Sequence, residues 1–137
     1  MLRLHITLNS IAFGEIFVII ENMKKVLLIE DDISTSEAVK YILTTYGFNV
    51  YTHSTGLKVD EVVKACEPNL ILLDIRLPGK SGIQVCKELK QTSDIPIILF
   101  SAEDDEKKLV SECNADAFLG KPFDINELIV SISLHAN

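Results

Sequence analysis

Polar and charged side chains follow four short apolar runs in this sequence, and their types are suited to phosphate and metal chemistry. The run Leu70 to Leu73 ends in Asp74. The other runs, 24–29, 95–100 and 117–119, lead to Glu30, Asp31 and Asp32, to Ser101, and to Lys121, respectively. A branched apolar run is typical of a strand buried on both faces. Each polar residue therefore marks the place where a strand leaves the core.

Together these side chains could carry out the transfer of a phosphoryl group. The carboxylates of Glu30, Asp31 and Asp74 together carry a charge of -3, and Lys121 contributes +1. A divalent cation would bring the sum to zero, and carboxylate oxygens suit Mg²⁺, which uses few protein ligands. Asp74 would then be the nucleophile toward phosphorus. Lys121 and the ion would stabilise the transferring oxygens, and the Ser101 hydroxyl could hydrogen-bond one of them.

Each of these residues has a simpler explanation when it is taken alone. An aspartate after a strand is usually a cap or turn residue, and an acidic triplet is usually a solvated loop that also caps a helix. A lone serine could cap the following helix, and a lysine before a proline is an ordinary loop residue. The phosphoryl-transfer interpretation therefore depends on the joint placement of all of them at the ends of four strands.

Strand and helix patterns alternate along the chain, which is what would bring these residues together. The runs 24–29, 48–53, 70–73, 95–100 and 117–119 predict five strands. Apolar residues at helical spacing predict a helix after each strand: Ala38 to Tyr46, Val59 to Cys66, Ile83 to Leu89, Leu109 to Cys113, and Ile125 to Ile132. Ser34 with Glu37 has capping-box spacing, as has Asp124 with Glu127, and Gly47 is a helix stop.

This alternation predicts an α/β fold in which helices cover both faces of a parallel sheet. Right-handed crossovers place all five carboxyl ends of the strands at one edge. Ligands of open α/β sheets bind at that edge. The polar strand ends are thus expected to form one site.

Composition limits the classes of protein that fit. The 137 residues suit one domain, and 47% are hydrophobic. A net charge of -7 argues against nucleic-acid binding, which needs a basic surface. No apolar run reaches the roughly 18 residues of a membrane helix, so membrane insertion is not expected. The three cysteines, Cys66, Cys86 and Cys113, lack metal-ligand spacing and are expected to be reduced core residues of a cytoplasmic protein.

From about Lys24 to Leu134 the chain resembles a response-regulator receiver domain of two-component signalling, of the single-domain chemotaxis type. The matching motifs are VLLIEDD, LILLDIRLPGKSG, IPIILFSAE and AFLGKPF. The resemblance implies a flavodoxin-like, doubly wound (βα)5 fold with strand order 2-1-3-4-5. It also implies Mg²⁺-dependent transfer of a phosphoryl group from a sensor histidine kinase or a histidine phosphotransfer protein.

The resemblance gives each matching residue an expected role. Asp74 corresponds to the phosphorylation site, and Glu30 and Asp31 correspond to the acidic pair for Mg²⁺, while Asp32 falls outside that pair. The backbone carbonyl of Arg76 corresponds to a further metal ligand. The remaining roles are those of a hydroxyl residue that follows the phosphoryl group, a switch aromatic, and a phosphate-pairing lysine before a cis peptide bond; they fall to Ser101, Phe118 and Lys121 with Pro122.

A phosphorylated aspartate would also act as a switch. The added charge of about -1.5 to -2 is expected to draw Ser101 inward and to let Phe118 turn in. This would change the face formed by the fourth helix, fifth strand and fifth helix, where a downstream protein target would bind. The chain is expected to be a monomer, or a weak dimer formed through the same face. Arg76 and Glu103 are expected to gate hydrolysis as a pair, or else to be two independent solvated side chains.

Rival interpretations require features that the sequence lacks. A P-loop ATPase needs a glycine-rich loop with lysine, a haloacid-dehalogenase-type phosphatase needs a second aspartate where Arg76 stands, and a flavodoxin-like carrier needs hydroxyl residues instead of the acids after the first strand. We therefore expect no enzymatic activity beyond self-phosphorylation and self-dephosphorylation. A phosphoaspartate-forming phosphatase remains the less favoured alternative.

The two ends of the sequence leave alternatives open. Residues 23–137 are assigned to the receiver domain, and residues 1–22 lie outside the resemblance. This extension could be a disordered segment from an upstream start codon, or a real segment whose IFVII run (16–20) docks on a partner or another copy. A stand-alone receiver is favoured over a fragment of a larger regulator with an output domain.

Overall fold

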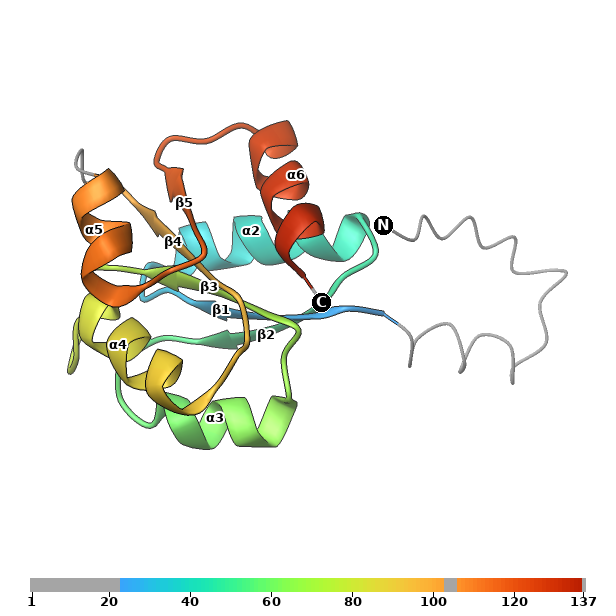
Figure 1. Ribbon diagram of the computed structural model, residues 1–137. Coiled ribbons are helices and arrows are strands. Elements are labelled where there is room, and N and C mark those ends of the chain that lie inside the picture. The colour runs from blue at the N-terminus through green and yellow to red at the C-terminus, as the bar shows by residue number, and fades with distance from the viewer. Residues whose placement is uncertain (1–22, 103–105, 137) are drawn as a thin grey trace, which may run out of the picture.

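Five parallel strands form the centre of the structure, a computed structural model that describes residues 23–102 and 106–136 (Figure 1). The strands are β1 (Lys25–Ile29), β2 (Asn49–His53), β3 (Leu70–Asp74), β4 (Ile97–Ser101) and β5 (Ala117–Gly120). They pair in the order β2-β1-β3-β4-β5. This confirms the predicted flavodoxin-like α/β fold, with shifts of one or two residues at the strand ends.

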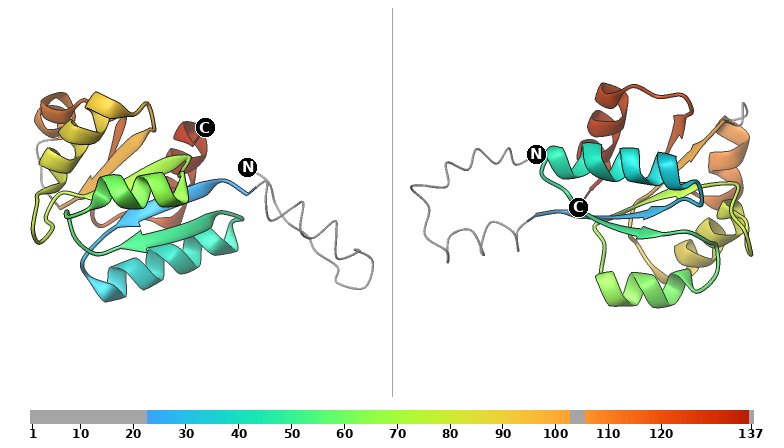
Figure 2. Two further views of the ribbon diagram at one scale, coloured as in Figure 1. Left: turned by 90° about the horizontal axis from the view of Figure 1, so that it is seen from below. Right: turned by 180° about the vertical axis from the view of Figure 1, so that it is seen from behind.

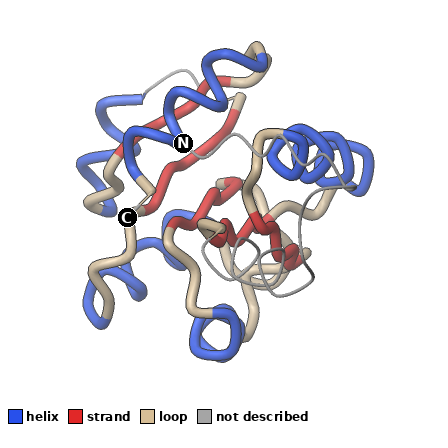
Figure 3. Tube along the Cα trace, turned by 90° about the vertical axis from the view of Figure 1, so that its right-hand side faces the viewer, coloured by secondary structure: helices blue, strands red, loops and turns tan. Residues whose placement is uncertain are grey.

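Helices cover both faces of the sheet. They are α2 (Ile33–Thr45), α3 (Val59–Cys66), α4 (Gly82–Thr92), α5 (Glu106–Cys113) and α6 (Ile125–His135). The fourth and fifth predicted helices are therefore α5 and α6. Helices α2 and α6 lie on one face and α3, α4 and α5 on the other (Figure 2). Figure 3 shows the strands enclosed between these helices.

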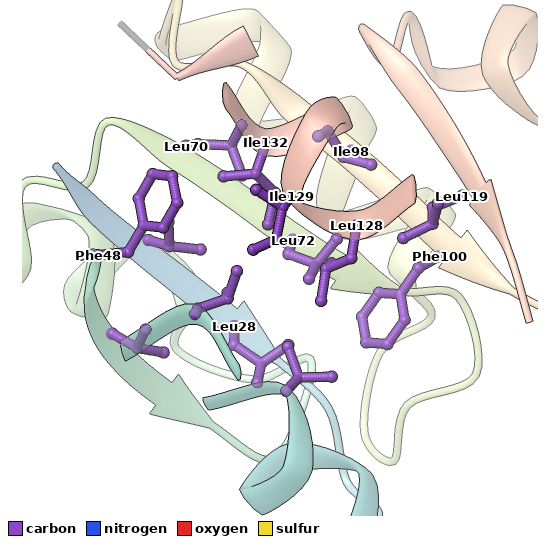
Figure 4. Close-up of a cluster of buried hydrophobic side chains, with 14 residues drawn as sticks. Leu28, Phe48, Leu70, Leu72, Ile98, Phe100, Leu119, Leu128, Ile129 and Ile132 are labelled. Atoms are coloured by element: carbon purple, nitrogen blue, oxygen red, sulfur yellow. The ribbon is translucent and has the colours of Figure 1, made fainter. Parts of the chain in front are cut away.

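Two hydrophobic clusters fill the space between the sheet and its helices. Every residue of β3 and of β4 is buried, which explains their uninterrupted apolar sequences. Side chains alternate between the two faces. Leu70 and Leu72 pack under α6 (Figure 4), whereas Ile71 and Leu73 pack in the cluster on the other face. The α6 side of the first cluster consists of Leu128, Ile129 and Ile132. This packing fixes the strands that present the polar residues.

The strand register aligns the polar residues at one edge. Ile29 lies beside His53 and Leu73, so Glu30 and Asp74 leave their strands at the same level. Asp74 lies beside Phe100, and Ser101 beside Gly120. The polar residues at the strand ends therefore lie at one edge, as expected, because the parallel strands are paired in matching register.

The first helix begins earlier than its predicted cap. Asp32, not Ser34, is the N-cap of α2: its carboxylate accepts hydrogen bonds from the backbone N–H of Thr35 at 3.0 Å and from the Thr35 hydroxyl at 2.5 Å. The capping box of Ser34 and Glu37 was thus wrong, because an ionised aspartate two residues upstream supplies a stronger acceptor. These hydrogen bonds lower the pKa of Asp32.

Other local predictions are confirmed. Asp124 caps α6 by accepting from the backbone N–H of Glu127 at 2.7 Å. Gly47 ends α2 with a φ of +92°, as expected of a helix stop. The Lys121–Pro122 peptide bond is cis.

The three cysteines are free and buried, as expected for reduced core residues. Burial raises the pKa of the Cys66 and Cys86 thiols, so both stay protonated. Across the part of the chain that the structure describes, no helix has the length and hydrophobicity to cross a membrane. The extension, residues 1–22, lies outside the described residues.

Candidate functional site

Three carboxylates meet at the carboxyl edge of the sheet. Ligand oxygens of Glu30, Asp31 and Asp74 all lie within 4.8 Å of one another. Glu30 and Asp74 are only 3% and 6% exposed, whereas Asp31 is exposed to solvent. The site is therefore open on the side of Asp31 and closed by the sheet on the other.

Lys121 is the cation that joins the two buried acids. Its Nζ lies 3.2 Å from Glu30 Oε1 and 3.4 Å from Asp74 Oδ2. The ammonium group also stands 4.4 Å from the centre of the Phe100 ring, a favourable cation–π distance. Its backbone N–H donates to the carbonyl of Ser101 at 2.8 Å. The lysine is thus held at the end of β5 both by its main chain and by its side chain.

The electrostatics of the site leave a place for a further positive charge. Burial, and next the neighbouring Asp74 carboxylate, raise the pKa of Glu30 to about 8, although Lys121 acts in the opposite direction. Among the described residues, Glu30 Oε2 is the one buried side-chain oxygen or nitrogen without a hydrogen-bond partner. A hard cation would supply the missing partner and offset the crowding of acids, so these residues fit a magnesium ion.

The loop after β3 closes tightly around Asp74. The backbone N–H of Arg76 donates to Asp74 Oδ1 at 3.3 Å, and that of Gly82 donates to the carbonyl of Ile75 at 2.8 Å. A Cβ atom at Gly82 would lie 2.1 Å from the Asp74 carbonyl oxygen, so only glycine fits here. Ser81 caps α4 by accepting from the backbone N–H of Gln84 at 3.2 Å.

The remaining predicted site residues are Ser101, Phe118, Arg76 and Glu103. Ser101 is 3% exposed and ends β4 beside Gly120, the last residue of β5, which Lys121 follows. Phe118 is partly buried against the cluster shared by α3, α4 and α5. The Arg76 side chain is exposed. Glu103, its expected gate partner, lies outside the described residues, so the gate prediction is not tested.

Sequence reasoning gave no role to the residues on the β2 side of the site. A cleft of about 360 Å³ adjoins the acids and is lined by Glu30, Asp31, Ile33, Ser36, Glu37, Thr52, His53 and Ser54. His53 is the last residue of β2. Its imidazole at a strand end, beside the register position of Ile29, is the signal that could have drawn attention to it.

The chain matches the family model of the response regulator receiver domain over residues 26–133. The protein belongs to this family. The BeF3-activated N-terminal receiver domain of Klebsiella pneumoniae RstA is 28% identical, with a TM-score of 0.79 over 83% of this chain and 99% of that one. The receiver domain of the Francisella response regulator 1452 is 26% identical, with a TM-score of 0.77 over 82% and 96% of the two chains.

Chemotaxis response regulator CheY4 of Vibrio cholerae has the same fold, with 24% identity and a TM-score of 0.76 over 82% of this chain and 98% of that one. The receiver-domain prediction and the strand order are thereby confirmed. As a receiver domain of two-component response regulators, the protein has a phosphoacceptor signalling role, which implies interaction with histidine kinases or phosphotransfer proteins.

Proposed function

We propose that Asp74 is the residue that accepts the phosphoryl group from a phosphohistidine of a sensor kinase or phosphotransfer protein. A carboxylate oxygen of Asp74 forms the new bond to phosphorus as the nitrogen–phosphorus bond of the donor breaks, and the departing imidazole takes up a proton. The observation that carries this proposal is the contact of Lys121 with both Glu30 and Asp74, because it brings a cation to a buried strand-end aspartate.

Glu30, Asp31 and Asp74 would hold Mg²⁺ together with the backbone carbonyl of Arg76. The ion, when bound, neutralises charge on the oxygens of the transferring group. Lys121, which contacts Glu30 and Asp74, would contribute a second positive charge, and Ser101 would offer a hydroxyl from the end of β4. Asp74 is held for attack because the Arg76 N–H fixes one of its oxygens.

Phosphorylation would then alter the α5–β5–α6 face. Ser101 moving toward the phosphoryl group would vacate space into which Phe118 turns, and Phe118 starts from a partly buried position on β5. A downstream protein target, or a second copy in a weak dimer, would recognise the changed face. BeF3⁻ with Mg²⁺ should shift the NMR signals of Phe118 and of α6; unchanged signals there would contradict the switch.

The chain's own chemistry would be limited to gaining and losing this phosphoryl group. Arg76 is exposed beside the site, where its side chain would hinder the attack of water on phosphorus. Arg76→Ala should then shorten the half-life of the phosphorylated protein. A half-life equal to that of the wild type would show that Arg76 contributes only its backbone.

The decisive experiment is phosphorylation by acetyl phosphate with Mg²⁺, followed by mass spectrometry of the intact protein. One added phosphoryl group is expected on the wild type and none on Asp74→Asn. Asp94→Asn is the matched control, because Asp94 is an exposed aspartate in the loop before β4, and it should be modified like the wild type. Modification of Asp74→Asn at the wild-type level would refute the assignment.

A further inference from the structure

We propose that His53 is a positioning residue that braces the Asp74 loop against the Glu30 side of the site. The inference rests on the proposed function, because it concerns the same metal and phosphoryl site. It arises from a continuous series of contacts from β2, through the segment 54–58, to the loop between β3 and α4. No residue of that segment belongs to the acidic cluster itself.

His53 makes two contacts in two directions. Its carbonyl accepts the backbone N–H of Glu30 at 3.0 Å, which fixes the main chain where the first acid begins. Its ring Nε2 lies 2.7 Å from the carbonyl oxygen of Leu57. Since a carbonyl can only accept, Nε2 carries the proton of this bond. One residue thus links the metal-binding side of β1 to the segment that follows β2.

The segment after His53 packs directly against the loop that follows Asp74. The backbone N–H of Gly56 donates to the carbonyl of Pro78 at 3.0 Å. Gly79 has a φ of +85°, and a Cβ atom built on it would lie 2.5 Å from Leu57 Cγ. Leu57 remains 50% exposed while it covers this glycine, so its position is set by the loop contact and not by burial in the core.

The braced loop in turn defines the geometry around Asp74. It carries the Arg76 N–H that holds Asp74 Oδ1 and the Arg76 carbonyl proposed as a metal ligand. Its far end is fixed where Gly82 packs on the Asp74 carbonyl. Its middle is held by contacts with the 54–58 segment, whose Leu57 is tied to the His53 ring. Loss of the hydrogen bond between the His53 ring and the Leu57 carbonyl should let the middle of the loop move outward and loosen the site.

Two substitutions separate the hydrogen bond from the size of the side chain. His53→Gln places an amide N–H about where Nε2 stands, whereas His53→Phe keeps a ring without a donor. Titration calorimetry should show that His53→Phe weakens Mg²⁺ binding about threefold to tenfold, the worth of roughly one hydrogen bond. His53→Gln should stay within about twofold of the wild type, being matched in reach and donor.

A purely structural role would give a different result. In that case His53→Phe would lower the midpoint of urea unfolding but leave the Mg²⁺ dissociation constant of the folded protein unchanged, and the proposal would be overturned. Leu57→Ala should weaken Mg²⁺ binding in the same direction, and combining it with His53→Phe should add little, because both act through one contact path.

A second measurement keeps the brace distinguishable from the proposed function. The amide NMR signal of Arg76 reports the loop position without any ion or phosphoryl group. His53→Phe should shift this signal and His53→Gln should not; an unshifted signal in His53→Phe refutes the brace even if Asp74 is phosphorylated. Conversely, a shifted signal together with an unmodified Asp74 would support the brace and refute the phosphoacceptor assignment.

Discussion

Glu30→Gln should change how stability depends on pH in the Mg²⁺-free protein. The pKa of Glu30 lies at about 8 in the folded protein against 4.5 for the ordinary carboxyl. The folded state therefore binds this proton more tightly than the unfolded state does. The stabilisation from protonation is fully present below pH 4.5 and is lost as the pH rises toward 8. Glutamine is neutral at every pH and so avoids this loss.

The size of the effect follows from the same two values. Each pH unit between them corresponds to about 1.4 kcal/mol, and Glu30 is 3% exposed, so solvent screens the effect little. Glu30→Gln should gain on the wild type by up to about 1.4 kcal/mol per pH unit between pH 5 and 8, and on the order of 3 to 4 kcal/mol over the whole interval. Saturating Mg²⁺ should reverse the gain, because only the ionised glutamate is a strong ligand.

Urea unfolding followed by circular dichroism, in a chelating buffer at several pH values, measures this difference. Glu88→Gln is the control: Glu88 is an exposed residue whose pKa is lowered below 4.5 by hydrogen bonds from Lys80 and then Gln84. Its substitution should leave the stability difference from the wild type nearly constant between pH 5 and 8, with a weak trend of the opposite sign only at more acidic pH. A stability difference between Glu30→Gln and the wild type that does not grow with pH would refute the buried, proton-binding state of Glu30.

Three further predictions test neighbouring parts of the structure by urea unfolding. Lys121→Ala should destabilise the Mg²⁺-free protein by about 1 to 2 kcal/mol at pH 8, because it removes the cation from two buried acids; unchanged stability would contradict its pairing role. Gly82→Ala should cost about 2 to 3 kcal/mol through its clash with the Asp74 carbonyl, whereas Gly120→Ala, whose Cβ would meet nothing nearer than 3.8 Å, should cost far less. Asp32→Ala should cost about 1 kcal/mol as a lost N-cap and Ser34→Ala almost nothing; the reverse order would restore the capping box.

The sequence was sufficient to predict the fold because its strongest signals come from burial. Strands β3 and β4 are buried over their whole length, and such strands have an apolar pattern that no exposed element shares. Alternation with helices then determines parallel pairing, and parallel pairing brings the strand ends to one edge. Glu30, Asp74 and Lys121 could be predicted as neighbours because only the order of elements was needed.

Contacts between loops could not be predicted in this way. The cap of α2 was assigned to Ser34 because serine and aspartate are both good caps, and only the geometry of Thr35 shows that Asp32 takes the place. His53 was passed over because its partner is a backbone carbonyl in its own loop, and carbonyls leave no trace in a sequence. The cramped positions of Gly79 and Gly82 likewise depend on what packs against them.

The placement of the acids at this edge reflects a conflict between stability and function. A buried polar atom without a hydrogen-bond partner destabilises a fold, and Glu30 Oε2 is such an atom. Apolar residues of similar size at Glu30 and Lys121 would be expected to give a more stable protein. The sheet can retain Glu30 and Lys121 at this edge because the pairing of β1 with β3 holds the strand ends in register independently of the charges. The same crowding would make the site responsive: a bound cation would relieve it, whereas a phosphoryl group would add negative charge to it. With the strand ends held in register, we expect either change to act on the loops around the site.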